Sequence, residues 1–123
     1  VRWTSPVNYM KRQATSDYEL RGKTVKAGED LVLFYCSANR DEDVFEDPFT
    51  FDVGRSPNRH LGFGWAEHYC LGAHLVKASM TALVEEMIKR VDWIKTADER
   101  TYTASNFVVG LKTLPVHYKL LNG

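Results

Sequence analysis

The sequence predicts an α+β fold in which one long helix is flanked by short antiparallel strands. Apolar residues between positions 71 and 92 recur at the spacing of one helix face. Residues 13–37 and 100–120 alternate apolar and polar side chains between glycine-containing turns, which is typical of strands. Residues 38–60 are polar and turn-rich. These patterns predict a small antiparallel sheet, a meander, one long helix and a C-terminal hairpin, in that order.

Composition limits the classes of protein that the chain can represent. The 123 residues suffice for one modest domain, and 16 basic side chains balance 16 acidic ones. A net charge of +0 gives no field that would attract nucleic acid or an anionic membrane. The two cysteines are far apart and do not suggest a disulfide framework. The longest apolar runs are too short for a membrane span and no signal sequence is visible, so we expect a cytoplasmic protein.

The elements are justified in chain order. Residues 1–12 open without a capping residue, as though in the middle of an element, and Pro6 ends this opening segment. Within 13–37, turns are expected at Arg21-Gly22 and Ala27-Gly28, and a buried strand is expected to contain Cys36. The loop at 61–72 leads into the helix, and the hairpin should turn at Val109-Gly110.

Cys70 is the residue with the strongest chemical signal. It lies at the start of the predicted helix, where free backbone N–H groups and the macrodipole stabilise a thiolate by about 0.3–1 kcal/mol. Glycines on both sides allow the backbone to approach a flat or bulky ligand. Zinc is disfavoured because close ligand pairs such as C-x-x-C are missing. A nucleophilic cysteine with His68 as its base, and a buried structural cysteine, both remain open.

The residues around Cys70 carry a family resemblance. The pattern F-G-x-x-x-H-x-C-x-G resembles the haem-binding signature of the cytochrome P450 superfamily; its members here are Phe63, Gly64, His68, Cys70 and Gly72. The resemblance implies haem b, iron protoporphyrin IX, with Cys70 as the axial thiolate ligand of the iron. It also implies that Phe63 packs beside the thiolate, that His68 bonds a haem propionate, and that Gly72 lies against the porphyrin. One departure is Ala66, where the family usually has glycine, and we expect backbone strain there.

The resemblance extends over the whole chain, as about the last third of a family member. Arg2 matches the arginine of an E-x-x-R motif, whose glutamate would precede Val1. The resemblance therefore implies that residues 1–12 form the end of the helix that carries this motif, followed by a substrate-facing segment. The resemblance implies that Arg12 pairs with a propionate, with Lys11 as its rival. Thr50 stands where the family usually has a second arginine, and Arg55 and Arg59 are candidates to compensate. The substrate contacts implied are Val7, Met10, Phe107 and Val108.

The fold implied is the C-terminal part of the mainly α cytochrome P450 fold. The activity implied is that of a haem-thiolate monooxygenase, which uses O2 to hydroxylate an apolar small molecule such as a terpenoid, alkane, fatty acid or steroid. A ferredoxin with its ferredoxin reductase, or a flavoprotein, would donate the electrons. We expect the isolated fragment to be inactive. Two alternatives are a haem-binding carrier or sensor module without turnover, and a thiol enzyme that uses Cys70.

Overall fold

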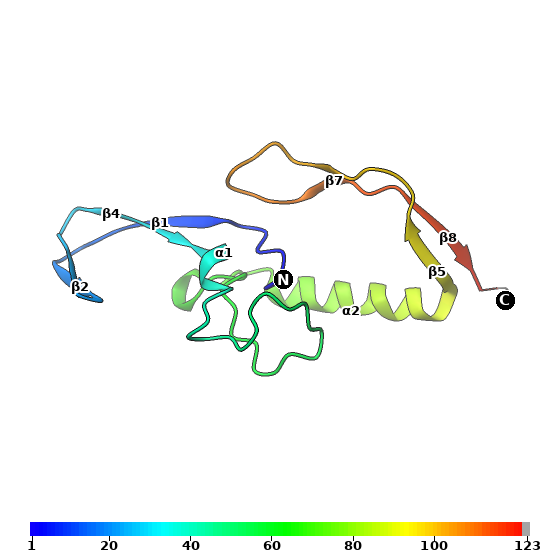
Figure 1. Cartoon of the computed structure of the whole chain (residues 1–123), viewed down its shortest axis with the longest axis horizontal. Coiled ribbons are helices and arrows are strands. Elements are labelled where there is room, and N and C mark those ends of the chain that lie inside the picture. Colours follow the sequence, from blue (N-terminus) through cyan, green and yellow to red (C-terminus); the bar gives the residue numbers. More distant parts are fainter. Residues whose placement is uncertain (122–123) are drawn as a thin grey trace. The chain divides into compact units, whose positions relative to one another are not determined.

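A computed structural model describes residues 1–121 (Figure 1). The chain divides into two compact units, and each is described by itself. The first unit holds Val1–Gly62 together with Ser105–Val109. The second holds Phe63–Ala104 and the chain from Gly110 onward. The fold is a small α+β arrangement of antiparallel hairpins with one long helix, as the sequence predicts.

The first unit contains two separate two-stranded sheets rather than one small sheet. Strand β1 (Tyr9–Gln13) pairs antiparallel with β4 (Asp30–Phe34). Strand β2 (Tyr18–Leu20) pairs antiparallel with β3 (Lys23–Val25) (Figure 1). Arg21 and Gly22 join β2 to β3, and their φ values of 49° and 77° are both left-handed. Such a pair of positive φ values suits the tight hairpin turn expected at this position.

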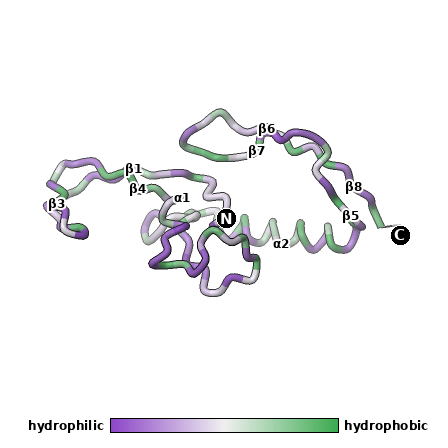
Figure 2. The backbone as a smooth tube through the Cα atoms, in the orientation of Figure 1, coloured by the Kyte–Doolittle hydropathy of each residue, from purple (hydrophilic) through white to green (hydrophobic). Residues whose placement is uncertain are grey.

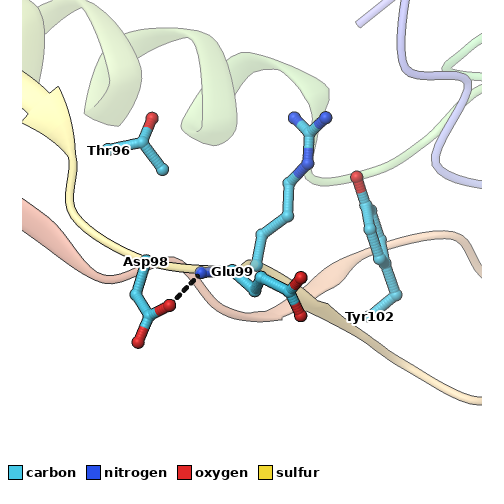
Figure 3. A pocket seen from close by; sticks show the side chains of 5 residues that line it. Thr96, Asp98, Glu99 and Tyr102 are labelled. Atoms are coloured by element: carbon cyan, nitrogen blue, oxygen red, sulfur yellow. Dashed lines mark hydrogen bonds between the residues drawn. The ribbon is translucent and has the colours of Figure 1, made fainter.

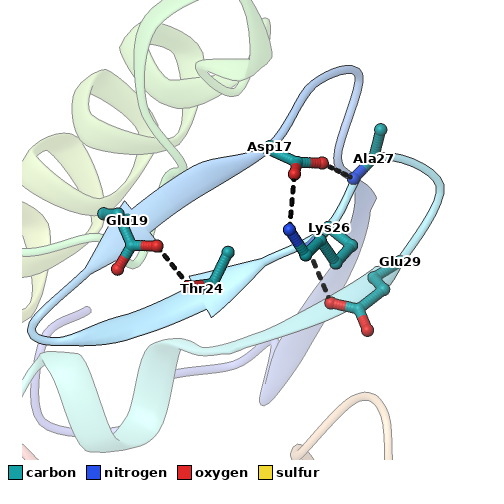
Figure 4. A network of polar contacts seen from close by, with 6 residues as sticks. All are labelled: Asp17, Glu19, Thr24, Lys26, Ala27 and Glu29. Carbon is teal, nitrogen blue, oxygen red and sulfur yellow. Dashed lines mark hydrogen bonds and ion pairs between the residues drawn. The ribbon is translucent and has the colours of Figure 1, made fainter.

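Charged side chains surround the base of the β2–β3 hairpin (Figure 4). Asp17 accepts hydrogen bonds from Lys26 Nζ at 2.7 Å and from the Ala27 N–H at 2.9 Å. Glu29 accepts one from the Lys26 N–H at 2.8 Å. Glu19 on β2 accepts one from the Thr24 hydroxyl on β3. The bonds to Asp17 and Glu29 hold the turn that the sequence predicts at Ala27-Gly28.

The prediction that Cys36 lies in a buried strand is wrong. Strand β4 ends at Phe34, and Cys36 is half-buried in the short helix α1 (Tyr35–Ala38). The chain turns here because Tyr35 is buried and donates its N–H to Asn8 O at 2.8 Å. The start expected for the strands at residue 13 is also too late, since β1 begins at Tyr9.

A turn-rich segment without strands follows α1, as far as the boundary of the first unit. Its buried apolar residues are Phe45, at 4% exposure, and Pro48. Arg2, at 5% exposure, lies 5.0 Å from the Phe45 ring. The opening residues form a turn, closed by a hydrogen bond from the Ser5 N–H to Val1 O at 2.9 Å.

The second unit contains a 3-10 turn (Ala66–His68), the long helix and two strand pairs. Helix α2 (Ala73–Arg90) has Gly72 as its N-cap residue, and it occupies most of the predicted range 71–92. Glu86 forms ion pairs with Lys89 at 3.0 Å and Arg90 at 2.8 Å near its end.

The predicted C-terminal hairpin is longer than expected. Strand β5 (Val91–Thr96) directly follows the helix and pairs with β8 (Val116–Leu120). Strand β6 (Thr101–Tyr102) pairs with β7 (Leu111–Thr113) farther along the same hairpin (Figure 1). The start of β5 escapes detection because Val91 also continues the apolar period of the helix.

Helix α2 carries a band of apolar side chains that is exposed in the structure. Figure 2 shows hydrophobic positions recurring along it. Its large apolar side chains with at least 40% exposure are Leu75, Val76, Met80, Leu83, Val84 and Ile88. In the described part of the chain, no helix has the length and apolar character needed to cross a bilayer.

Candidate functional site

The loop before α2 folds back on itself. The Cys70 N–H donates to Phe63 O at 2.7 Å, and the Tyr69 N–H donates to Ala66 O at 2.9 Å. Gly64 is buried with φ at 76°, and a Cβ added there would lie 2.5 Å from His68 O. A side chain at position 64 would therefore force the loop open. Sequence and backbone agree that this turn requires glycine.

Ala66 also has a left-handed backbone, with φ at 50°. A side chain with a Cβ is disfavoured in this region, because the Cβ approaches the following carbonyl oxygen. The expected strain at the departure from the family pattern is thus present in the backbone. The loop keeps its closing bonds in spite of that strain, since the Cys70 and Tyr69 N–H groups both have partners inside it.

Cys70 is exposed, which contradicts the alternative of a buried structural cysteine within this chain. The loop that contains it also exposes large apolar side chains: Trp65 is 72%, Tyr69 44% and Leu71 100% exposed. Gly72 has φ at −82°, which any residue can adopt. A Cβ there would meet only Cys70 Sγ, at 3.9 Å. The missing side chain at Gly72 therefore leaves free space directly beside the sulfur.

Phe63 and His68 both belong to the closed loop before α2, but they have different neighbours. The Phe63 ring makes an edge contact with Tyr69 at 6.3 Å between centroids, and Lys77 Nζ from α2 lies 5.6 Å from the Phe63 ring centre. His68 ends the 3-10 turn. Within residues 1–121, no hydrogen bond joins His68 to Cys70. The structure thus gives no direct base for a thiol nucleophile.

Arg12 and Lys11 differ in their partners. Lys11 Nζ forms an ion pair with Asp30 at 2.6 Å across the β1–β4 sheet. Arg12 is half-buried, and its Nη1 donates to the Lys11 backbone oxygen at 2.7 Å. Of the two cations, Lys11 is therefore the one already neutralised by a carboxylate. Both belong to the first unit and Cys70 belongs to the second.

Three of the four residues expected to contact substrate lie together in the first unit. Val7 and Val108 form an isolated antiparallel bridge, and the Asn8 N–H donates to Phe107 O at 2.9 Å. The Phe107 ring contacts Tyr9 at 5.6 Å between centroids. Phe107 is 39% and Val108 41% exposed. Met10 lies farther along β1, opposite Leu33.

Arg2 lies in a buried polar cluster. The sequence pointed to the arginine but not to its hydrogen-bond partners. Arg2 Nη1 donates to Asn39 O at 2.8 Å and Pro48 O at 3.0 Å, and Nη2 donates to Thr50 O at 3.4 Å. Backbone oxygens, Thr50 among them, thus receive the guanidinium. Burial lowers the pKa of Arg2, the positive charges of Arg55 and Arg40 lower it further, and Asp52 raises it.

Arg55 does not contact Arg2 through a hydrogen bond. It donates to the carbonyl oxygens of Glu46 and Asp47, and its Nε is buried without a partner among the described residues. Arg59 is exposed. Within the described residues, backbone oxygens therefore receive the Arg2 guanidinium, and Arg55 instead holds the neighbouring turn.

A polar pocket elsewhere in the second unit contains none of the predicted site residues (Figure 3). It lies at the turn between β5 and β6, lined by Thr96, Asp98, Glu99, Arg100 and Tyr102. The Glu99 N–H donates to Asp98 Oδ1 at 2.7 Å, so the turn is bonded locally. Its lining of charged side chains makes it unlike a site for an apolar ligand.

Comparisons with known proteins give one family. The family described as Cytochrome P450 matches residues 1–121. Cytochrome P450-terp from a Pseudomonas species is 46% identical over 118 residues, which cover 96% of this chain and 28% of that protein. The methyl-branched lipid omega-hydroxylase of Mycobacterium tuberculosis is 48% identical over 117 residues, covering 94% of this chain and 27% of that protein.

A solved structure gives the same result at the level of the fold. The crystal structure of CYP108D1 from Novosphingobium aromaticivorans matches with a TM-score of 0.90 and 42% identity, over 98% of this chain and 29% of that one. The chain thus spans somewhat more than a quarter of the length of these relatives.

Proposed function

The chain belongs to the cytochrome P450 family, and from this premise we propose that it is the haem-ligating part of a haem-thiolate monooxygenase, with Cys70 as the iron ligand. The single observation that carries the proposal is an exposed cysteine, Cys70, in a closed loop before α2. A sulfur held in a fixed loop and open on one side can ligate iron without a rearrangement of the backbone. Family membership supplies the implication of haem.

The surroundings of the sulfur fit a large, flat, apolar group. Trp65, Tyr69 and Leu71 present exposed apolar surface, and the space at Gly72 lies directly beside Sγ. Desolvating such surface favours an apolar partner by roughly 25 cal/mol per Å² buried. A bare metal ion would gain nothing from these apolar side chains. The donor set, one soft sulfur amid apolar groups, is therefore suited to haem iron.

Each predicted site residue would have a distinct role in that complex. The Cys70 thiolate would donate to the iron, and its N–H bond to Phe63 O would hold the sulfur in place. His68 and Arg12 would each bond a propionate, and Arg12 is preferred over Lys11 because Asp30 already engages Lys11. Gly64 would keep the loop closed, and Gly72 would leave room for the ring.

We infer that the substrate is an apolar small molecule. Val7, Met10, Phe107 and Val108 would form part of the pocket wall, where they would exclude water from the reacting C–H bond. Terpenoids, alkanes, fatty acids and steroids fit such a wall. A relative named as a methyl-branched lipid omega-hydroxylase agrees with this substrate class.

Bound haem would supply the iron centre at which O2 is activated, so that one oxygen atom enters the substrate and the other is reduced to water. The electrons would come from a ferredoxin with its reductase or from a flavoprotein. The protein residues would contribute the ligand, the charges that hold the propionates, and a dry pocket. We propose that all of this needs the longer natural polypeptide, because the chain spans about 28% of its relative.

The proposal is tested by a carbon monoxide difference spectrum of the dithionite-reduced, haem-loaded natural polypeptide. We expect the strongly red-shifted Soret band of thiolate ligation in the unaltered protein and in Cys36→Ser, and its loss in Cys70→Ser. The Cys36 variant is the matched control, since Cys36 lies half-buried in α1. A band that persists in Cys70→Ser would refute the ligand assignment.

Further measurements distinguish the two alternatives from this proposal. A haem carrier or sensor would show the thiolate band but no substrate-dependent consumption of O2. A thiol enzyme would show no stoichiometric haem binding and would lose activity when iodoacetamide alkylates Cys70.

A further inference from the structure

We propose that Asn39 is a positioning residue that fixes the start of the Cys70 loop through the backbone N–H of Leu61. This inference rests on the proposed function, because it assigns Asn39 a role in thiolate ligation. Asn39 is the largest side chain with no exposed surface among the described residues. Neither its place in the sequence nor the haem signature assigns it a role.

Asn39 joins three segments that are far apart in the sequence. Its Nδ2 donates to Ser5 Oγ at 2.9 Å, and its Oδ1 accepts from the Leu61 N–H at 2.7 Å. Its backbone oxygen accepts from Arg2 Nη1 at 2.8 Å, and its backbone N–H donates to Tyr35 O at 2.9 Å. All these residues belong to the first unit. We call Arg2, Ser5, Asn39 and Leu61 the Asn39 junction.

The hydrogen bonds of the junction have a fixed direction. The Ser5 hydroxyl donates its only hydrogen to Arg2 O at 2.9 Å, so Ser5 Oγ can only accept from Asn39. The Leu61 N–H can only donate, so it requires an oxygen from Asn39. An amide side chain supplies both groups that are needed, a donor for Ser5 Oγ and an acceptor for the Leu61 N–H. A carboxylate would lack the donor, and a leucine side chain would lack both.

Leu61 is the residue through which the hydrogen bonds of the Asn39 junction affect the loop that contains Cys70. No strand or α-helix lies between α1 and Leu61, so secondary structure does not set the distance between them. Two hydrogen bonds next to Leu61 are local, from the His60 N–H to Asn58 O at 2.9 Å and from the Gly62 N–H to His60 Nδ1 at 3.1 Å. The Asn39 bond spans 22 residues. It therefore anchors the chain two residues before Phe63, whose oxygen holds the Cys70 N–H.

The test separates the two sides of the Asn39 amide in the haem-loaded natural polypeptide. Ser5→Ala removes the acceptor of Nδ2 and leaves the Leu61 bond. Asn39→Asp also leaves an acceptor for Leu61, because the nearby Arg2 guanidinium favours the charged carboxylate. Asn39→Leu removes the Leu61 bond in a side chain with the same branching and the same number of non-hydrogen atoms. Unfolding midpoints and carbon monoxide difference spectra are recorded for all three variants.

We expect lower unfolding midpoints in all three variants, but loss of the thiolate band only in Asn39→Leu, measured well below its midpoint. The Leu61 amide should exchange its hydrogen about tenfold faster in Asn39→Leu than in Ser5→Ala, the size of one net hydrogen bond. The proposal fails if, in all three variants, the intensity of the thiolate band falls in proportion to the unfolding midpoint. Asn39 would then be merely structural.

One further measurement tests the proposal even if Asn39→Leu does not fold. In the unaltered protein, the Leu61 amide should exchange much more slowly than the amide of Val53, a residue 90% exposed. Equal rates would overturn the proposal, because the Asn39 bond would then not persist in solution. This exchange measurement needs no haem, so a failure of the proposed function leaves it interpretable.

Discussion

At Ala66 the backbone has a φ of 50°, and this conformation costs a residue with a Cβ about 1–2 kcal/mol. Replacement by glycine should remove that cost, partly offset by the greater freedom of glycine in the unfolded chain, about 0.4–1 kcal/mol. We predict that Ala66→Gly slows the loss of haem to a scavenger protein, by up to about tenfold if the net gain reaches 1.4 kcal/mol.

Ala73→Gly is the matched control for that substitution. Ala73 is fully buried in the first turn of α2, where glycine weakens a helix by about 0.5–1 kcal/mol. It should therefore release haem faster, in the direction opposite to Ala66→Gly. Faster release from Ala66→Gly as well would show that the Ala66 side chain supports the loop rather than strains it.

Gly72 and Gly64 lie on either side of Cys70 and should respond differently to alanine. At Gly72 the backbone tolerates a Cβ, and its nearest contact would be Cys70 Sγ at 3.9 Å. At Gly64 a Cβ would meet His68 O at 2.5 Å with φ at 76°. We predict that Gly72→Ala changes the unfolding free energy by about 1 kcal/mol or less, the range of N-cap exchanges, yet lowers haem affinity at least tenfold.

Gly64→Ala should instead lower both the unfolding free energy and haem affinity, since it opens the loop itself. Titration of the apoprotein with haem and chemical denaturation of the apoprotein measure the two quantities separately. Unchanged haem affinity in Gly72→Ala would contradict the proposal that the space beside the sulfur receives the porphyrin.

Residue identity alone predicted part of the candidate site. Cys70 and Gly64 are visible because their residue types are demanded by chemistry and by a positive φ. Asn39 is not visible, because an asparagine after an apolar run equally fits an exposed turn. Its role depends on Ser5 and Leu61, which reach it only when the chain is folded.

At the scale of elements, the β2–β3 hairpin provides a prediction about pH. The hydrogen bond from Lys26 lowers the pKa of Asp17 below 3.8, and the bond from the Ala27 N–H lowers it further. A carboxyl group with a lowered folded pKa stabilises the folded state above its unfolded pKa. This contribution is lost as the pH falls below 3.8 through the folded value. The group is exposed, so the effect on stability is small.

We predict that Lys26→Met raises the pKa of Asp17 toward 3.8, as followed by NMR of its carboxyl carbon. Lys23→Met is the control, because Lys23 lies on β3 and the structure gives it no contact with Asp17. Equal shifts in the two variants would mean that general hairpin charge, rather than the Lys26 bond, lowers the value.

Elements with a strong period could be predicted, and those set by tertiary contacts could not. Helix α2 follows from its apolar repeat, and the turn at Arg21-Gly22 follows from its glycine. The end of β4 at Phe34 could not be predicted, because LVLFYCS reads as a continuous strand. Burial of Tyr35 against the Asn8 carbonyl decides it, and this contact joins residues 27 positions apart.

At the scale of the whole molecule, the small core limits the stability of the isolated chain. The buried apolar side chains of the described residues, proline aside, are Tyr35, Phe45 and Ala73, while the apolar band of α2 is exposed. Three such side chains provide little hydrophobic free energy against the conformational entropy of 123 residues. We propose that further parts of the natural polypeptide cover α2, in agreement with the 28% share of the relative that this chain spans.

The isolated chain should therefore lack a cooperative thermal transition and should bind a hydrophobic dye such as ANS. The longer natural polypeptide, loaded with haem, should unfold cooperatively and bind little dye. As a matched pair, Leu83→Ser and Ile88→Ser on α2 should lower dye binding by the isolated chain but destabilise the longer polypeptide, because the exposed apolar surface of the former would be core in the latter. A sharp transition in the isolated chain without dye binding would show that the exposed band is not an unfilled core.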